Sequence, residues 1–192
     1  MAVHPLPEAA MLRQLFEYEP KTGTLVWRPR HQGMAKPDGS LITHREAGIF
    51  NTRFAGTPAL AVVQPNGMMT GSLFSRKIFA HVVIWALHNK CWPEHEVDHI
   101  DGDCQNNRIE NLRAVTPSEN QRNRSRPKNN TSGCVGVSWH TRDKVWRAYI
   151  GSEKGNTISL GSFGSKFEAI TARKKAEAQY GYHPNHGRAA NG

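Results

Sequence analysis

The alternation of apolar and polar residues divides the first half of the chain into short predicted elements. These are a helix around residues 12–16, a strand at 25–27, a hairpin made of 60–63 and 69–74, and a buried helix at 78–88. The hairpin is predicted from the turn-forming run Pro65-Asn66-Gly67 between its two apolar segments. Residues 29–58 show little periodicity, and no element is assigned to them.

Residues 97–124 predict the order strand, long loop, strand, helix. The second strand is Leu112-Arg113-Ala114-Val115. Thr116 and Glu119 have the spacing of a capping box, and Pro117 between them suits a first helical position. The sequence therefore predicts a helix that begins at Pro117.

The last third of the chain alternates with the period of β-strands and ends with a helix. One face of the predicted strands carries Val137, Trp139, Trp146, Ala148, Ile150, Ile158 and Leu160, and is expected to be buried. A second capping box at Ser165 and Glu168 opens a helix that runs to about Tyr180 and stops at Gly181. Alanines on that helix allow close packing, so we expect a three-stranded antiparallel sheet that packs on one helix.

Charge is distributed unevenly along the chain. The net charge is +9 over 192 residues. Residues 1–104 carry 10 Lys and Arg against 10 Asp and Glu, whereas residues 105–192 carry the remaining 15 against 6. A basic half beside a neutral half indicates a partner that is a polyanion, such as DNA. The alternative is that the basic residues only solubilise the surface.

Cysteine content and hydropathy indicate a cytoplasmic protein without a membrane segment. Cys91, Cys104 and Cys134 are odd in number and contain no Cys-x-x-Cys pair, which favours reduced thiols over disulfides or a zinc ribbon. The start of the chain has no apolar run typical of a signal peptide. The most apolar segment, 78–87, is too short to cross a bilayer.

The segment 97–120 combines the groups that phosphodiester hydrolysis with one metal requires. His99 is the candidate general base, because an imidazole accepts protons near neutral pH. Asp98 offers a hard oxygen ligand, and Asn120 offers an amide oxygen one turn into the predicted helix, a pair that favours Mg²⁺ or Mn²⁺ over zinc. Arg124 lies one turn beyond Asn120 and is placed to hold a phosphate, while Arg122 projects toward the flanking backbone.

Two structural expectations accompany this candidate site. Adjacent residues on a regular strand point to opposite faces, so Asp98 and His99 serve one site only where the strand ends or bulges. The residues Asp101, Gly102, Asp103, Asn106 and Asn107 are interpreted as turn formers. The histidines at positions 81, 88 and 95 are interpreted as structural or surface residues, and Arg108 and Arg113 as either phosphate contacts or solvated side chains.

The run Val-Asp-His-Ile-Asp-Gly-Asp at 97–103, with Asn-Asn-Arg, Asn-Leu-Arg and Ser-Glu-Asn after it, resembles HNH endonucleases of the phage and homing type. The resemblance covers residues 74–124 and implies a ββα-metal fold. It makes His99 the general base, Asp98 a metal ligand and Asn111 the central residue that orients His99 by pinning the loop. Asn120 takes the position where many members have histidine, which implies a weakly held hard cation. A phage or mobile-element origin in a bacterial host follows from the same resemblance.

Residues 132–187 are similar to the Apetala-2-type DNA-binding domain of plant transcription factors and mobile endonucleases. The similarity rests on Gly136-Val137, Trp146, Ala148, Ile150, the run 160–163 and the alanine-rich helix. It implies that one face of the sheet lies in the major groove of DNA. The residues expected to contact DNA there are Ser138, His140, Arg142, Lys144, Arg147, Tyr149, Thr157 and Ser159, with Arg122, Arg126 and Lys128 on the connecting segment.

Together these patterns predict an α+β protein with four parts: an N-terminal α+β region at 1–75, a nuclease core at 76–125, a basic linker at 126–134 and a DNA-binding domain at 135–187. The predicted function is metal-dependent cleavage of double-stranded DNA, with nicking as the first event because there is one active site. Two alternatives stay open: a DNA-binding regulator that keeps a nuclease-like core only as a scaffold, and a nuclease that acts on RNA.

Overall fold

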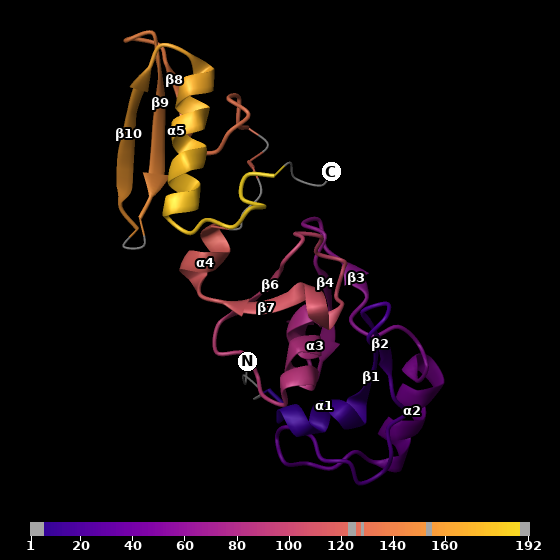
Figure 1. Ribbon diagram of the computed structural model, residues 1–192. Coiled ribbons are helices and arrows are strands. Elements are labelled where there is room, and N and C mark those ends of the chain that lie inside the picture. Colours follow the sequence, from indigo (N-terminus) through magenta and orange to yellow (C-terminus); the bar gives the residue numbers. More distant parts are fainter. Residues whose placement is uncertain (1–5, 123–125, 128, 153–154, 189–192) are drawn as a thin grey trace. The chain divides into compact units, whose positions relative to one another are not determined.

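The computed structural model describes residues 6–122, 126–127, 129–152 and 155–188. The chain forms two compact units, Met1–Ala114 and Val115–Gly192 (Figure 1). Helices and small antiparallel sheets occur in both units, which confirms the predicted α+β class. The segment predicted as the nuclease core, 76–125, spans the end of the first unit and the start of the second. The predicted domain limits stay predictions.

The first unit is built around helix α3 (Ala80–Asn89), which was predicted from its apolar surface. Its other elements are α1 (Ala9–Leu15), β1 (Phe16–Glu19), β2 (Thr24–Trp27), α2 (His44–Phe54), β3 (Val62–Val63), β4 (Met69–Leu73), β5 (Arg76–Phe79), β6 (Glu96–His99) and the 3₁₀ turn η1 (Ile109–Asn111). Strand β7 (Leu112–Val115) pairs with β6 and leads into the second unit. The helix α3 contacts α1, β4, β5, β6 and η1, so it holds the hairpins and the loop after β6 on one core.

Four elements of the first unit were not predicted: β1, β5, α2 and η1. Strand β5 includes residues 78–79, which were expected to begin the helix at 78–88, so that helix starts later, at Ala80. Strand β1 follows α1 directly and pairs antiparallel with β2, so that Phe16 faces Trp27 and Tyr18 faces Leu25. Helix α2 lies inside the unassigned segment 29–58. Its single strongly buried residue is Ala47, which explains the weak apolar periodicity, but its capping box at Thr43 and Glu46 was a usable signal in the sequence.

The second unit begins with α4 (Pro117–Arg122), which starts at the predicted residue. Strands β8 (Val137–His140), β9 (Val145–Gly151) and β10 (Thr157–Phe163) form one antiparallel sheet in the order β10-β9-β8. Helix α5 (Lys166–Gln179) lies along one face of that sheet (Figure 1) and keeps the predicted capping box. The predicted sheet and helix are therefore confirmed.

Two details of this sheet differ from the simple alternation. Trp139 was expected on the buried face, but its exposed fraction is 47% because β8 ends one residue later at the edge of the sheet. The register of β10 shifts between Ser159 and Gly161, so Leu160 is an inserted residue. The shift places Ser162 opposite Arg147, on the exposed face together with Tyr149 and Ser159.

No helix in the described part of the chain has the length and apolar character that crossing a lipid bilayer requires.

Candidate active site

His99 is the last residue of β6, and its exposed fraction is only 3%. The chain turns immediately after it, with Gly102 at a φ of 77°. The alternating burial of β6 places Val97 and His99 toward the core, whereas Asp98 is half-buried. Strand β6 therefore ends at His99, but its alternating burial directs Asp98 and His99 to different faces of the strand. That the two residues serve one site stays a prediction.

Asn107 holds the imidazole of His99. Its Oδ1 lies 3.0 Å from His99 Nε2, and its exposed fraction is 1%. An amide oxygen only accepts hydrogen bonds, so this contact requires a proton on Nε2 and makes Nδ1 the proton-accepting nitrogen. The Asn107 amide group donates to Met69 Sδ at 3.2 Å, which fixes the orientation of the amide. Asn107 was interpreted as a turn former, and this was incomplete, because its side chain points into the core.

His81, at the start of α3, was interpreted as a structural or surface residue. It is buried, and its ring packs edge-on against that of His99 with 4.9 Å between centroids. Burial and the neighbouring His99 lower the pKa of His81 to about 4, although Asp98 acts in the opposite direction. Its Nδ1 is buried without a hydrogen-bond partner in the described part of the chain. A neutral ring beside His99 adds no positive charge to the site at pH 7.

Arg113, on β7, lies next to Asp98. Its Nη2 is 3.2 Å from Asp98 Oδ2, and both side chains are partly buried. Arg113 was expected to be either a phosphate contact or a solvated side chain. The structure shows an ion pair, which fixes the Asp98 carboxylate across the two strands that frame the loop.

Asn111, which the family resemblance made the residue that orients His99, forms hydrogen bonds with the start of the loop after β6. Its Oδ1 accepts from the Asp101 backbone at 3.0 Å, and its Nδ2 donates to Asp101 Oδ1 at 2.9 Å and to the Asn106 carbonyl at 2.8 Å. The Asn111 carbonyl accepts from the Ile100 backbone. Burial acts to raise the pKa of Asp101, but hydrogen bonds from Asn106, Asp103 and Asn111 outweigh it, so the pKa is lowered. Asn111 does not contact His99 itself in these bonds; it shapes the loop that carries Asn107.

The β1–β2 hairpin packs against the same loop and forms hydrogen bonds with it. Tyr18 donates its hydroxyl to the Asn107 carbonyl at 3.3 Å and accepts from the Ile109 backbone at 2.9 Å. Gly23, at a φ of 73°, approaches so closely that a Cβ would lie 2.6 Å from the Asn107 carbonyl carbon. Only glycine fits there. Residues far upstream in the sequence thus position the group that holds His99.

The remaining predicted site residues lie in the second unit or outside the described residues. Asn120 lies on α4, where its backbone donates to the Thr116 carbonyl. Arg122 packs over the ring of Tyr182, and Arg126 donates to the Gly133 carbonyl. Arg124 and Lys128 lie outside the described residues.

The exposed face of the β8–β10 sheet carries most of the residues expected to contact DNA. Ser138, Arg142, Lys144, Arg147, Tyr149, Thr157 and Ser159 are exposed, and His140 is half-buried. Asp143 accepts from Arg147 at 2.7 Å and lies 3.1 Å from His140 Nδ1. Part of the positive charge on this face is therefore neutralised by one carboxylate.

The donor atoms near His99 suit a hard cation only in part. The described residues contain no group of three or more histidine, cysteine, aspartate or glutamate side chains placed to hold a metal ion. Asp98 supplies one carboxylate beside His99, but Arg113 already pairs with it. A site with one or two protein oxygens, completed by water and phosphate, is the type that Mg²⁺ uses.

Comparison with known proteins identifies the segment that contains this site. A model of the HNH endonuclease family matches residues 79–122. Protein 3.8 of Escherichia phage T7 is 39% identical over 74 residues, which is 38% of this chain and 61% of that protein. The chain thus spans less than two thirds of the length of this phage relative. No solved structure matches the chain. The strand β6, the Asn111-pinned loop, β7 and α4 all fall inside the matched range, and residues 79–122 therefore carry a domain of the HNH endonuclease type.

Proposed function

We propose that this protein is a metal-dependent endonuclease that cuts double-stranded DNA at the site around His99. The observation that carries the proposal is the buried contact between His99 and Asn107, inside the segment that matches the HNH family. A histidine with one nitrogen fixed by a hydrogen bond presents the other nitrogen in a defined direction. Such an arrangement suits a general base.

The residues of this site have separate tasks. His99 accepts the proton of the attacking water at Nδ1, because Asn107 holds the proton on Nε2. Asn107 is a positioning residue, and its own place depends on Tyr18 and Met69. Asp98 contributes negative charge at the end of β6, and Arg113 keeps that carboxylate in place until substrate and cation arrive.

Asp98 is the residue of the first unit that would hold the cation, with Mg²⁺ or Mn²⁺ as the ions that prefer oxygen ligands. Asn120, on α4 of the second unit, stays a predicted ligand from the family resemblance. When bound, such an ion offsets negative charge on the phosphorane and on the leaving oxygen. Arg122 and Arg124, on and after α4, are proposed to hold flanking phosphates.

The second unit is proposed to bind DNA in the manner of an Apetala-2-type domain. What supports this is the polar exposed face of an antiparallel sheet backed by α5, together with the net positive charge of residues 105–192. Since His140 and Arg147 share Asp143, contacts with phosphates at Arg142 and Lys144 outweigh base recognition in this proposal. A single active site per chain cuts one strand in each event, so nicking precedes any double-strand break.

The proposal is tested with supercoiled plasmid and the full-length chain. We expect conversion to the nicked circle in Mg²⁺ or Mn²⁺ and none in EDTA, because removal of the cation leaves the developing charge without compensation. Binding of a duplex fragment should persist in EDTA, since the second unit needs no metal. Binding without cleavage under every divalent ion would favour a regulator with a nuclease-like scaffold instead, and cleavage of RNA alone would favour the ribonuclease alternative.

A further inference from the structure

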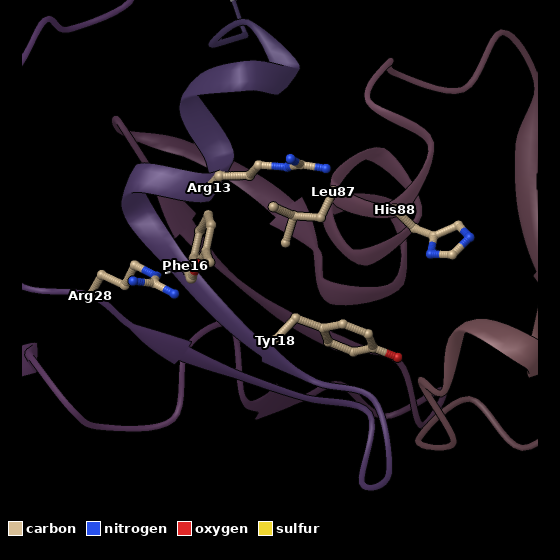
Figure 2. Close-up of a pocket in the computed structure, with 6 residues that line it drawn as sticks. All are labelled: Arg13, Phe16, Tyr18, Arg28, Leu87 and His88. Carbon is tan, nitrogen blue, oxygen red and sulfur yellow. Dashed lines mark hydrogen bonds between the residues drawn. The ribbon is translucent and has the colours of Figure 1, made fainter.

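Two adjoining depressions on the first unit share the side chains of Arg13 and Arg28. One has a volume of about 360 Å³ and the other of about 280 Å³. Figure 2 shows the larger one, with Arg13 and Arg28 on either side of the Phe16 ring and His88 at the far end of the pocket. We call the two depressions together the Arg13–Arg28 groove. It lies in the half of the sequence whose net charge is zero, where no polyanion contact was predicted.

Both depressions of the groove are positively charged, because Arg13 and Arg28 line each of them. Arg13, Arg28 and His88 line the first depression, and His31 lies in the second. None of the described residues that line either depression is acidic. Among the described residues, neither arginine forms an ion pair. Positive charge that is not neutralised within the protein indicates a ligand that is an anion.

Arg28 is held in a fixed orientation. Its Nε donates to the Phe16 carbonyl at 3.1 Å, and its backbone nitrogen donates to the Leu15 carbonyl at 2.9 Å. The bond at Nε leaves the two terminal nitrogens of the guanidinium as donors for a ligand. A guanidinium in this state matches the oxygens of a phosphate.

The groove is coupled to the site at His99 through Tyr18. The ring of Tyr18 lines the larger depression, while its hydroxyl binds the Asn107 carbonyl and the Ile109 backbone. Asn107 in turn holds His99. A strand bound in the groove would therefore be fixed relative to the catalytic loop by one continuous set of contacts within the first unit.

We propose that the Arg13–Arg28 groove binds the phosphodiester backbone of the DNA on which the nuclease acts, at phosphates away from the one that is cut. This inference rests on the proposed nuclease function for its choice of polyanion. It adds a contact surface in the first unit to the one proposed on the second.

The test measures binding of a labelled duplex oligonucleotide in EDTA over a range of salt concentrations. Each phosphate contact that is lost reduces the slope of log Kobs against log salt by about 1. We expect the magnitude of this slope to be smaller by about 2 in the double variant R13Q/R28Q than in the wild type. The matched control is R45Q/R53Q, which removes the same charge from exposed positions on α2 and should leave the slope near that of the wild type.

Single variants and a mononucleotide probe complete the test. R28Q loses the bond to Phe16, which can impair its folding, so R13Q and the charge-preserving Arg28→Lys are measured as well. In R13Q the slope of log Kobs against log salt should fall by about 1 in magnitude. In Arg28→Lys the slope should equal that of the wild type. Deoxyadenosine monophosphate is the probe for a free nucleotide. An unchanged slope in the folded variants would overturn the inference, as would loss of mononucleotide binding with unchanged binding of the duplex.

The result is independent of cleavage. If the nuclease function fails, the wild type does not nick plasmid in Mg²⁺, whatever the salt slope. If only the groove fails, plasmid is nicked as expected while the slopes of R13Q/R28Q and the wild type coincide.

Discussion

Replacement of His99 by alanine is expected to lower the rate of DNA cleavage by about 100-fold or more, because the attacking water loses its general base. Since the imidazole is buried and bonded to Asn107, no exposed residue can replace it at the same position. The rate of nicking under single-turnover conditions, with protein in excess over plasmid, measures the effect.

The control for this variant is His95→Ala, which removes an exposed histidine just before β6 and should retain the wild-type rate. Loss of a buried ring also leaves a cavity, so circular dichroism and thermal melting must show that His99→Ala is folded. A folded His99→Ala that cuts as fast as the wild type would end the assignment of His99 as the base.

Replacement of Asn107 by leucine is expected to lower kcat by about 10- to 100-fold with little change in KM, as when an outer-shell partner of a functional histidine is removed. Leucine has about the same size and shape as asparagine but cannot accept the hydrogen bond from His99 Nε2. The imidazole then loses the contact that sets its tautomer and direction. Steady-state kinetics on a labelled duplex separate the two parameters.

The matched control for Asn107 is Gln105→Leu. It makes the same change from a carboxamide to leucine at an exposed position in the same loop and leaves the bond between Asn107 and His99 in place, so kcat should stay within a few-fold of the wild type. Equal losses in Gln105→Leu and Asn107→Leu would show that the effect does not come from the contact with His99.

Local patterns in the sequence predicted a large part of the fold. The capping boxes at Thr116 and Ser165 fixed where α4 and α5 begin, because they depend on residues only three positions apart. The period-2 pattern gave the three strands of the second unit, since each strand has one face on α5. The Leu160 bulge and the exposure of Trp139 depend on the pairing of β10 and on the edge of the sheet, which a single segment does not encode.

The candidate site was predicted less completely than the fold. His99, Asp98 and Asn111 stood out because their residue types and spacing fit one chemistry. Asn107 lies in a run of turn-forming residues, and nothing in that run distinguishes the buried asparagine from its exposed neighbours. Its role depends on Tyr18, Gly23 and Met69, which are far away in the sequence. The place of His81 against His99 likewise results from the packing of α3 on β6.

In the proposed mechanism, one divalent cation is bound by Asp98 beside the imidazole of His99. Titration of the isotope-labelled protein with less than one equivalent of Mn²⁺ tests this directly, because this paramagnetic ion broadens the NMR signals of nearby nuclei. We predict that the signals of the His99 ring broaden selectively, while the side-chain amide of Asn156 stays sharp. A His99 ring that stays as sharp as Asn156 would contradict the proposed site.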